Sequence, residues 1–164
     1  MRAQEIMTAS PACCTPESTA YEAARLMAEC DCGVVPVVES AESRRLVGVV
    51  TDRDLSVRAL ARGMGADAKV RDLMTLDPLC CRPGDDVRDV ERAMAERQVR
   101  RIPVVDEDNR CVGIIAQADL ARAARAGHGV SEQEVARVVE SISEPSSRTG
   151  GGGVTAGRQP EARL

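Results

Sequence analysis

The stretch at residues 47–55, Val-Gly-Val-Val-Thr-Asp-Arg-Asp-Leu, decides the fold, because it returns at residues 112–120 as Val-Gly-Ile-Ile-Ala-Gln-Ala-Asp-Leu. Each copy predicts a short apolar strand that turns directly into a helix. Each also places a carboxylate, Asp54 or Asp119, one turn inside that helix. The helix N-terminus offers backbone N–H groups that no intrahelical partner uses. Such a corner can hold a ribose by its hydroxyl groups.

The repeat extends well beyond this stretch. Met7-Thr8 returns as Met74-Thr75, and Pro36-Val37-Val38 returns as Pro103-Val104-Val105, both at an offset of 67 residues. The opening stretch repeats at an offset of 65 residues, so the second copy has lost two residues in the polar turn between them. Surface turns tolerate such deletions best. The sequence therefore predicts two tandem copies of one unit.

Hydrophobic periodicity, helix caps and glycines place the same elements in both copies. In the first copy we expect strands at 12–15, 34–38 and 46–51, and helices from Ser18 or Thr19 and from Asp52 to about Arg62. In the second copy we expect strands at 79–81, 101–105 and 111–116, and helices at 85–97 and 117–126.

The expected fold class is α+β, with two β-α-β-β-α units at residues 1–66 and 67–127. A unit of about 60 residues is marginal alone, because its sheet leaves apolar surface uncovered. We therefore expect the two units to pack sheet to sheet about a pseudo-twofold axis. A capping box at Ser131–Glu134 predicts a further helix at 130–144, and the Ser- and Gly-rich residues 145–164 are typical of a disordered tail.

The composition argues against several function classes. The formal charge of −4 and the pI near 5.2 provide no overall basic field for nucleic acid or anionic lipid. Tyr21 is the only aromatic residue, which disfavours base stacking. No run approaches the roughly 18 apolar residues of a membrane span, and no signal peptide is evident, so we expect a cytoplasmic protein. Seven cysteines, an odd number, argue against a disulfide framework.

These doubled motifs resemble a tandem pair of CBS domains, the arrangement called a Bateman module, over about residues 1–126. The resemblance implies a regulatory module rather than an enzyme. It also implies AMP, ADP, ATP or S-adenosylmethionine as the ligand, bound in clefts between the repeats, with no cofactor required. A homodimer and an unidentified regulated protein are the implied partners, with no nucleic acid and no membrane. No catalytic motif such as a Walker loop or G-x-S-x-G is present.

The resemblance also assigns roles to residues of this chain. The ribose would be held by Thr51, Asp54 and Asp119, and Ala116 replaces the hydroxyl residue in the second copy. The adenine would lie against Thr8, Val34, Val35, Pro36, Thr75, Ile102 and Pro103. Phosphate would be bound by Arg53, Arg100 and Arg101.

Two alternatives remain open from the residues themselves. The first is a metal- or redox-responsive version of the scaffold that uses Cys30 and Cys32, although no C-x-x-C spacing supports it and we predict no metal site. The second is an interaction scaffold without a small ligand, in which Asp54 and Asp119 only stabilise the helix dipole.

Overall fold

The computed structural model describes residues 1–125, 133, 136, 139 and 140. Its first half contains β1 (Thr8–Ala9), α1 (Ala20–Glu29), β2 (Val34–Val38), β3 (Leu46–Thr51) and the helix η2 (Asp54–Ala59). The second half contains β4 (Thr75–Leu76), α2 (Val87–Glu96), β5 (Arg101–Val105), β6 (Cys111–Ala116) and α3 (Gln117–Arg125). Single 3-10 turns, η1 (Ala3–Glu5) and η3 (Val70–Asp72), precede β1 and β4.

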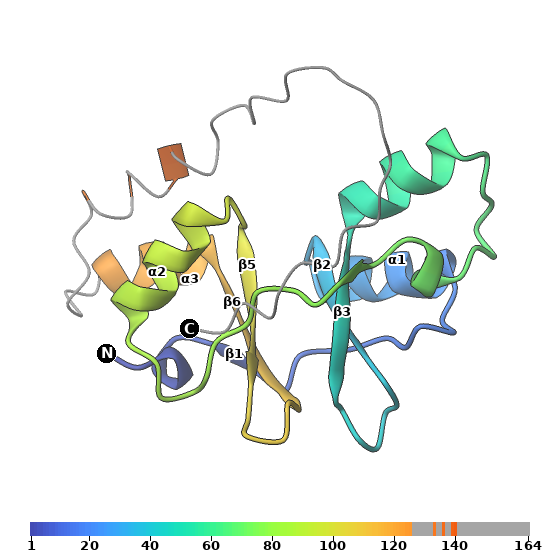
Figure 1. Cartoon of the computed structure of the whole chain (residues 1–164). Coiled ribbons are helices and arrows are strands. Elements are labelled where there is room, and N and C mark those ends of the chain that lie inside the picture. Colours follow the sequence, from blue (N-terminus) through green and yellow to red (C-terminus); the bar gives the residue numbers. More distant parts are fainter. Residues whose placement is uncertain (126–132, 134–135, 137–138, 141–164) are drawn as a thin grey trace.

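The strands form two three-stranded antiparallel sheets, with the orders β1-β6-β5 and β2-β3-β4. They lie side by side, and the helices cover their outer sides (Figure 1). Each sheet takes its third strand from the opening of the other repeat: Thr8 pairs with Ile114, and Thr75 pairs with Val49. The α+β class and the paired arrangement predicted from the repeat are therefore confirmed, and the exchange of edge strands is a feature that the repeat alone did not indicate.

The strands predicted at residues 12–15 and 79–81 do not form as predicted. Isolated bridges replace them, among them Cys14 with Val37 and Cys81 with Val104. Prolines border both segments, at 11 and 16 and at 78 and 83. Because proline has no N–H to donate, it prevents either segment from extending into a longer ladder.

Local signals explain where the helices begin. The Thr19 hydroxyl accepts a hydrogen bond from Glu22 N (3.2 Å), and Glu22 accepts one from Thr19 N (2.7 Å), which completes a capping box at the start of α1. Asp86 caps α2 by accepting from Arg88 N at 3.0 Å. The helix after β3 starts at Asp52, as predicted, but its central turn, η2, has π-type hydrogen bonding.

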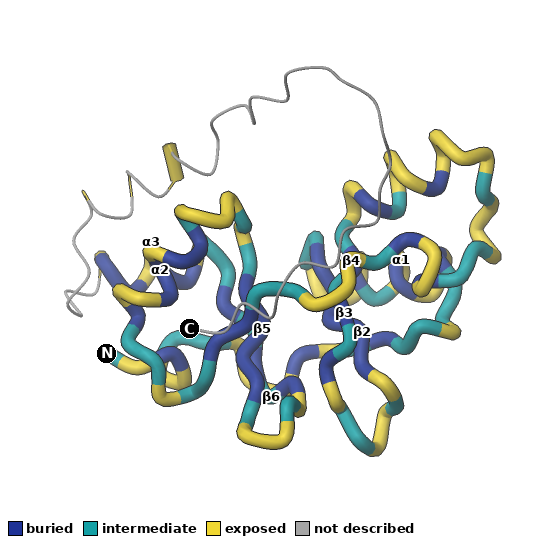
Figure 2. The backbone as a smooth tube through the Cα atoms, viewed as in Figure 1, coloured by how far each residue is buried: buried dark blue, intermediate teal, exposed yellow. Residues whose placement is uncertain are grey.

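The hydrophobic core is divided between the two sheets, and each part includes residues from the opening of the other repeat. Val70 packs with Val35, Val50 and the α1 residues Ala23 and Met27 in the first half. In the second half, Ala3 packs with Met94, Ile102, Ile115 and Leu120 in the corresponding cluster. Figure 2 shows the buried strands at the centre and the exposed turns and helix faces around them. Neither repeat therefore has a complete core by itself.

The turns of the two hairpins, β2–β3 and β5–β6, meet near the pseudo-twofold axis. Leu46 N donates to Asn109 O at 2.9 Å, and Cys111 N donates to Arg44 O at 2.8 Å. A small cluster formed by Val38, Leu46, Cys80, Val105 and Cys111 is buried beside these bonds. None of the helices in the described residues is long and apolar enough to cross a membrane. Apart from the four described positions there, the predicted helix at 130–144 and the predicted tail at 145–164 lie outside the described residues.

Candidate functional site

The exchanged edge strands bring Thr8 of the first repeat to the second repeat's carboxylate. Thr8 and Pro103 both pair with Ile114, so they lie in one row across the sheet β1-β6-β5. Strand β6 continues without a break into α3, whose first turn carries Asp119. Two residues that the resemblance assigned to adenine and ribose are thus placed at the same end of one sheet.

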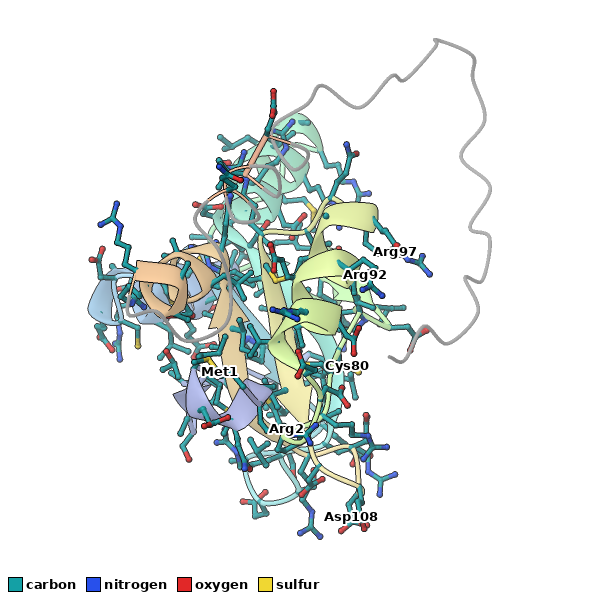
Figure 3. All side chains as sticks on the ribbon, turned by 90° about the vertical axis from the view of Figure 1, so that its left-hand side faces the viewer. Met1, Arg2, Cys80, Arg92, Arg97 and Asp108 are labelled. Atoms are coloured by element: carbon teal, nitrogen blue, oxygen red, sulfur yellow. The ribbon has the colours of Figure 1, made fainter. Side chains whose placement is uncertain are left out.

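A pocket of about 460 Å³ opens at this end, between η1 and α3. It is lined by Met1, Glu5, Ile6, Thr8, Asp119, Arg122 and Ala123. Figure 3 labels Met1 beside α3, on the side of this pocket. Five of these residues were missed from the sequence, namely Met1, Glu5, Ile6, Arg122 and Ala123. Only Arg122 had a sequence signal, since it follows Asp119 by three residues and so shares its helix face.

Asp119 is a buried carboxylate, 7% exposed, whose charge is balanced by its own helix. Its Oδ2 accepts a hydrogen bond from Ala116 N at 2.7 Å, and its Oδ1 forms an ion pair with the Arg122 guanidinium. Arg122 itself is exposed at the mouth of the pocket. The arrangement places a hydrogen-bond acceptor and an exposed cation together, which is the chemistry needed for a hydroxyl and an anionic group of one ligand.

Asp54, the counterpart of Asp119, interacts with more groups of the protein than Asp119 does. Its Oδ2 accepts from the Thr51 hydroxyl (2.8 Å) and from Thr51 N (2.9 Å), and Arg58 Nε lies 3.1 Å from its Oδ1. Arg58 also donates to Leu73 O at 2.8 Å, which ties the helix to the segment before β4. A ligand hydroxyl at Asp54 would therefore share the carboxylate with the Thr51 hydroxyl and with an arginine that is already anchored.

The other residues assigned to adenine differ in how deeply they are buried. Thr75 and Pro36 both pair with Val49, so they repeat the Thr8 and Pro103 row in the first sheet. Val35 and Ile102 are fully buried in the two cores, and Val34 is 6% exposed, so mainly their backbone groups remain for a ligand. Their role in adenine binding stays a prediction.

The three arginines assigned to phosphate do not line the pocket at Asp119. Arg53 and Arg100 are exposed, and Arg101 is half-buried. Arg101 reaches the first repeat, where its guanidinium lies close to Gly33 and Asp52. The position that a Cβ on Gly33 would occupy is 3.4 Å from Arg101 Nη1 and 2.8 Å from Asp52 Oδ2. The pocket instead holds Arg122 as its cation.

The cysteines suggested for a metal site are Cys30 and Cys32. Cys30 is exposed, and the Cys32 thiol lies 3.3 Å from Val34 O. Burial raises the pKa of Cys32. Among the described residues, no group of three or more His, Cys, Asp or Glu side chains is placed to hold a metal ion.

Comparison with known proteins agrees with this architecture. The sequence profile of the CBS domain matches residues 3–59 and again residues 70–126. The chain belongs to the CBS domain family. Both matches include the strand and helix that carry Asp54 or Asp119, so each repeat of this CBS pair has one candidate corner. The limits predicted for the two repeats, 66 and 67, remain a prediction.

Three relatives of this CBS pair are informative. The CBS domain-containing protein YhcV of Bacillus subtilis is 37% identical over 118 residues, which are 72% of this chain and 81% of YhcV. Hypoxic Response Protein I, whose crystal structure contains two coordinated zinc ions, is 34% identical in sequence. The match covers 74% of this chain and 98% of that chain, with a TM-score of 0.67. The structure of CBSX2, a CBS-pair protein of Arabidopsis thaliana, in complex with AMP is 30% identical, covering 76% and 96%, with a TM-score of 0.66.

Proposed function

We propose that this CBS pair is a regulatory module that binds an adenine nucleotide or a related adenosyl ligand between its repeats, with its main site in the pocket at Asp119. The observation that carries the proposal is that Thr8 from one repeat and Asp119 from the other line the same pocket. The complex of CBSX2 with AMP supports AMP as the first candidate, beside ADP, ATP and S-adenosylmethionine.

The mechanism follows from where the pocket lies. A ligand that contacts η1 and α3 together favours the arrangement in which the two repeats hold these elements side by side. A partner protein that reads this arrangement would bind with a different affinity when the ligand is present, because the two binding events share one conformational equilibrium. The module therefore acts by linkage and needs no catalytic group.

The side chains of the pocket also favour one kind of ligand. The Asp119 carboxylate accepts hydrogen bonds from the ribose hydroxyls, and the Arg122 guanidinium matches a phosphate. Glu5 lines the same pocket and adds negative charge there. Because this charge repels additional phosphates, we expect AMP to bind more tightly than ATP.

Isothermal titration of dialysed protein with AMP, ATP and S-adenosylmethionine tests the proposal. Asp119→Ala should weaken AMP binding at least tenfold, about 1.4 kcal/mol. Asp89→Ala is the matched control, because Asp89 also lies in the first turn of a helix and pairs with an arginine three residues later, but is exposed. No heat with any ligand, from protein shown by native mass spectrometry to carry none, would exclude the adenosyl-sensor function and favour the interaction scaffold.

A homodimer is the proposed assembly. Three apolar or aromatic side chains are exposed: Tyr21 on α1, Val57 on η2, and Leu60, which directly follows η2 and is 73% exposed. We expect a second copy to cover this face, since exposed apolar patches commonly mark interfaces. Leu60→Glu should produce a monomer in light scattering, while Leu76→Glu, at an exposed leucine on β4, should leave a dimer. A wild-type chain that is monomeric would contradict the assembly.

A zinc-responsive function is the second candidate, because the related Hypoxic Response Protein I contains two zinc ions. Elemental analysis of the purified chain, with Cys30→Ser and Cys32→Ser variants beside it, separates it from the nucleotide sensor. Stoichiometric zinc that both variants lose would support it, and zinc-free protein that binds AMP would exclude it.

A further inference from the structure

Cys13 lies on a segment that crosses from one sheet to the other. Ser10 N donates to Val112 O on β6 (2.9 Å), and Cys14 N donates to Pro36 O on β2 (3.1 Å). Cys13, between these two anchors, is partly exposed. Cys111 is the first residue of β6 and is 1% exposed. A segment of the first repeat thus carries Cys13 past the start of β6, where Cys111 lies.

Arg44 fixes the geometry between these two cysteines. Its Nε donates to Cys111 O at 3.2 Å, and its backbone O accepts from Cys111 N at 2.8 Å. Its Nη2 donates to Pro11 O at 3.0 Å and lies 3.4 Å from the Cys13 sulfur. The guanidinium is therefore held in place by backbone groups of both repeats, with its positive charge directed at Cys13.

Cys13 packs against the buried cluster that contains Cys111. A hydrogen bond from the Cys111 thiol, together with the Arg44 charge, lowers the pKa of Cys13 to about 7. The same hydrogen bond and burial raise the pKa of Cys111. Cys13 therefore favours the thiolate, which is the nucleophilic form, whereas Cys111 stays a protonated thiol.

The pseudo-twofold axis supplies an internal comparison. In the repeat, the positions equivalent to Cys13, Arg44 and Cys111 are occupied by Cys80, Asn109 and Leu46, respectively. Asn109 binds Leu46 as Arg44 binds Cys111, with Asn109 Nδ2 donating to Leu46 O at 3.0 Å. Only one of the two places therefore combines an arginine with two cysteines.

We propose that Cys13 and Cys111 are an oxidisable pair, which a hydroperoxide converts into a disulfide that joins the two repeats. The Cys13 thiolate attacks the peroxide oxygen, the O–O bond breaks, and Cys13 sulfenic acid and hydroxide form. The sulfur of Cys111 then displaces the sulfenic oxygen, and its proton leaves with that oxygen as water. In total, the two thiols lose two electrons as the disulfide forms, and one hydrogen peroxide gains them and is reduced to two waters.

Peptide mapping of the reduced full-length chain after one equivalent of hydrogen peroxide and a thiol-blocking quench tests this. Trypsin releases Cys111 in peptide 111–122 and Cys13, with Cys14, in peptide 3–25. We expect these two peptides to become linked, and the free thiols to fall from seven to five. The link should persist in Cys14→Ser and Cys80→Ser and disappear in Cys13→Ser.

Two further measurements keep the test decisive. In a Cys111→Ala variant with an unchanged circular dichroism spectrum, peroxide should leave a sulfenic acid at Cys13 that dimedone traps. In guanidinium chloride the preference for this pair should be lost, because the unfolded chain holds no two thiols together. A link that survives in Cys13→Ser, a link from 111–122 to another peptide, or no link in the folded chain would each overturn the proposal.

Discussion

Thr8 and Asp119 line one pocket, although one lies near the start of the described chain and the other near its end. Their meeting depends on strand β1, which leaves the first repeat and pairs with β6 of the second. A change at either residue should therefore affect the same bound ligand.

Arg122→Ala should separate phosphate recognition from nucleoside recognition. The guanidinium lies in the pocket beside the Asp119 carboxylate, where it can bind a phosphate. We expect AMP to bind about tenfold more weakly, about 1.4 kcal/mol, and adenosine to change little. Arg92→Ala removes the arginine of the exposed Asp89 pair and should change neither affinity. An equal loss for AMP and adenosine would show that Arg122 acts on the carboxylate alone.

Thr51→Ala should destabilise the fold modestly. The Thr51 hydroxyl donates to the buried Asp54 carboxylate at 2.8 Å, and the loss of one such bond costs about 1 to 2 kcal/mol. The reciprocal change, Ala116→Thr, offers the same hydroxyl to Asp119 and should stabilise the fold or leave it unchanged. Urea unfolding measures both variants, and a Thr51→Ala protein as stable as the wild type would contradict the role of this bond.

Leu73→Ala should test the exchange of segments between the repeats. Leu73 precedes β4, yet it is fully buried against Ala20 and Ala59 of the first half. Truncation of a buried leucine costs about 2 to 5 kcal/mol. Leu76→Ala, three residues later and 62% exposed, should cost less than about 0.5 kcal/mol. For the same reason residues 1–66 alone should not fold, as a circular dichroism melt of that fragment would establish.

Alkylation between pH 6 and 8 should depend on pH for Cys13 but hardly at all for Cys14 and Cys81. Because the thiolate is the reactive form and the pKa of Cys13 is lowered to about 7, iodoacetamide should label Cys13 faster as the pH rises from 6 to 8, with little gain above that. Burial raises the pKa of Cys14 and of Cys81 to about 12, so both should stay almost unlabelled over this range. Arg44→Gln should move the Cys13 midpoint to higher pH, and an unmoved midpoint would argue against the Arg44 charge as a cause.

Much of the local structure could be predicted from the sequence, because it depends on neighbours within a few residues. The apolar strands at 34–38, 46–51, 101–105 and 111–116 and the helix cap at Thr19 follow from side-chain periodicity and capping chemistry. The doubled motif was enough to predict two packed copies and the family. The two short strands predicted between prolines were wrong, because the flanking prolines have no N–H with which to extend the bridges at Cys14 and Cys81 into a ladder.

Contacts between distant segments were decided only by the tertiary structure. The sequence alone identified Thr8 and Asp119 as candidates, but the exchange of β1 and β4 determines that they meet. Arg122 was not predicted from the sequence at all, and Cys13 was only one of seven cysteines there. Their roles depend on Asp119, Arg44 and Cys111, which packing brings to them. Periodicity describes which side of an element is buried, whereas the partner on that side is set by how the two sheets and their exchanged strands pack together.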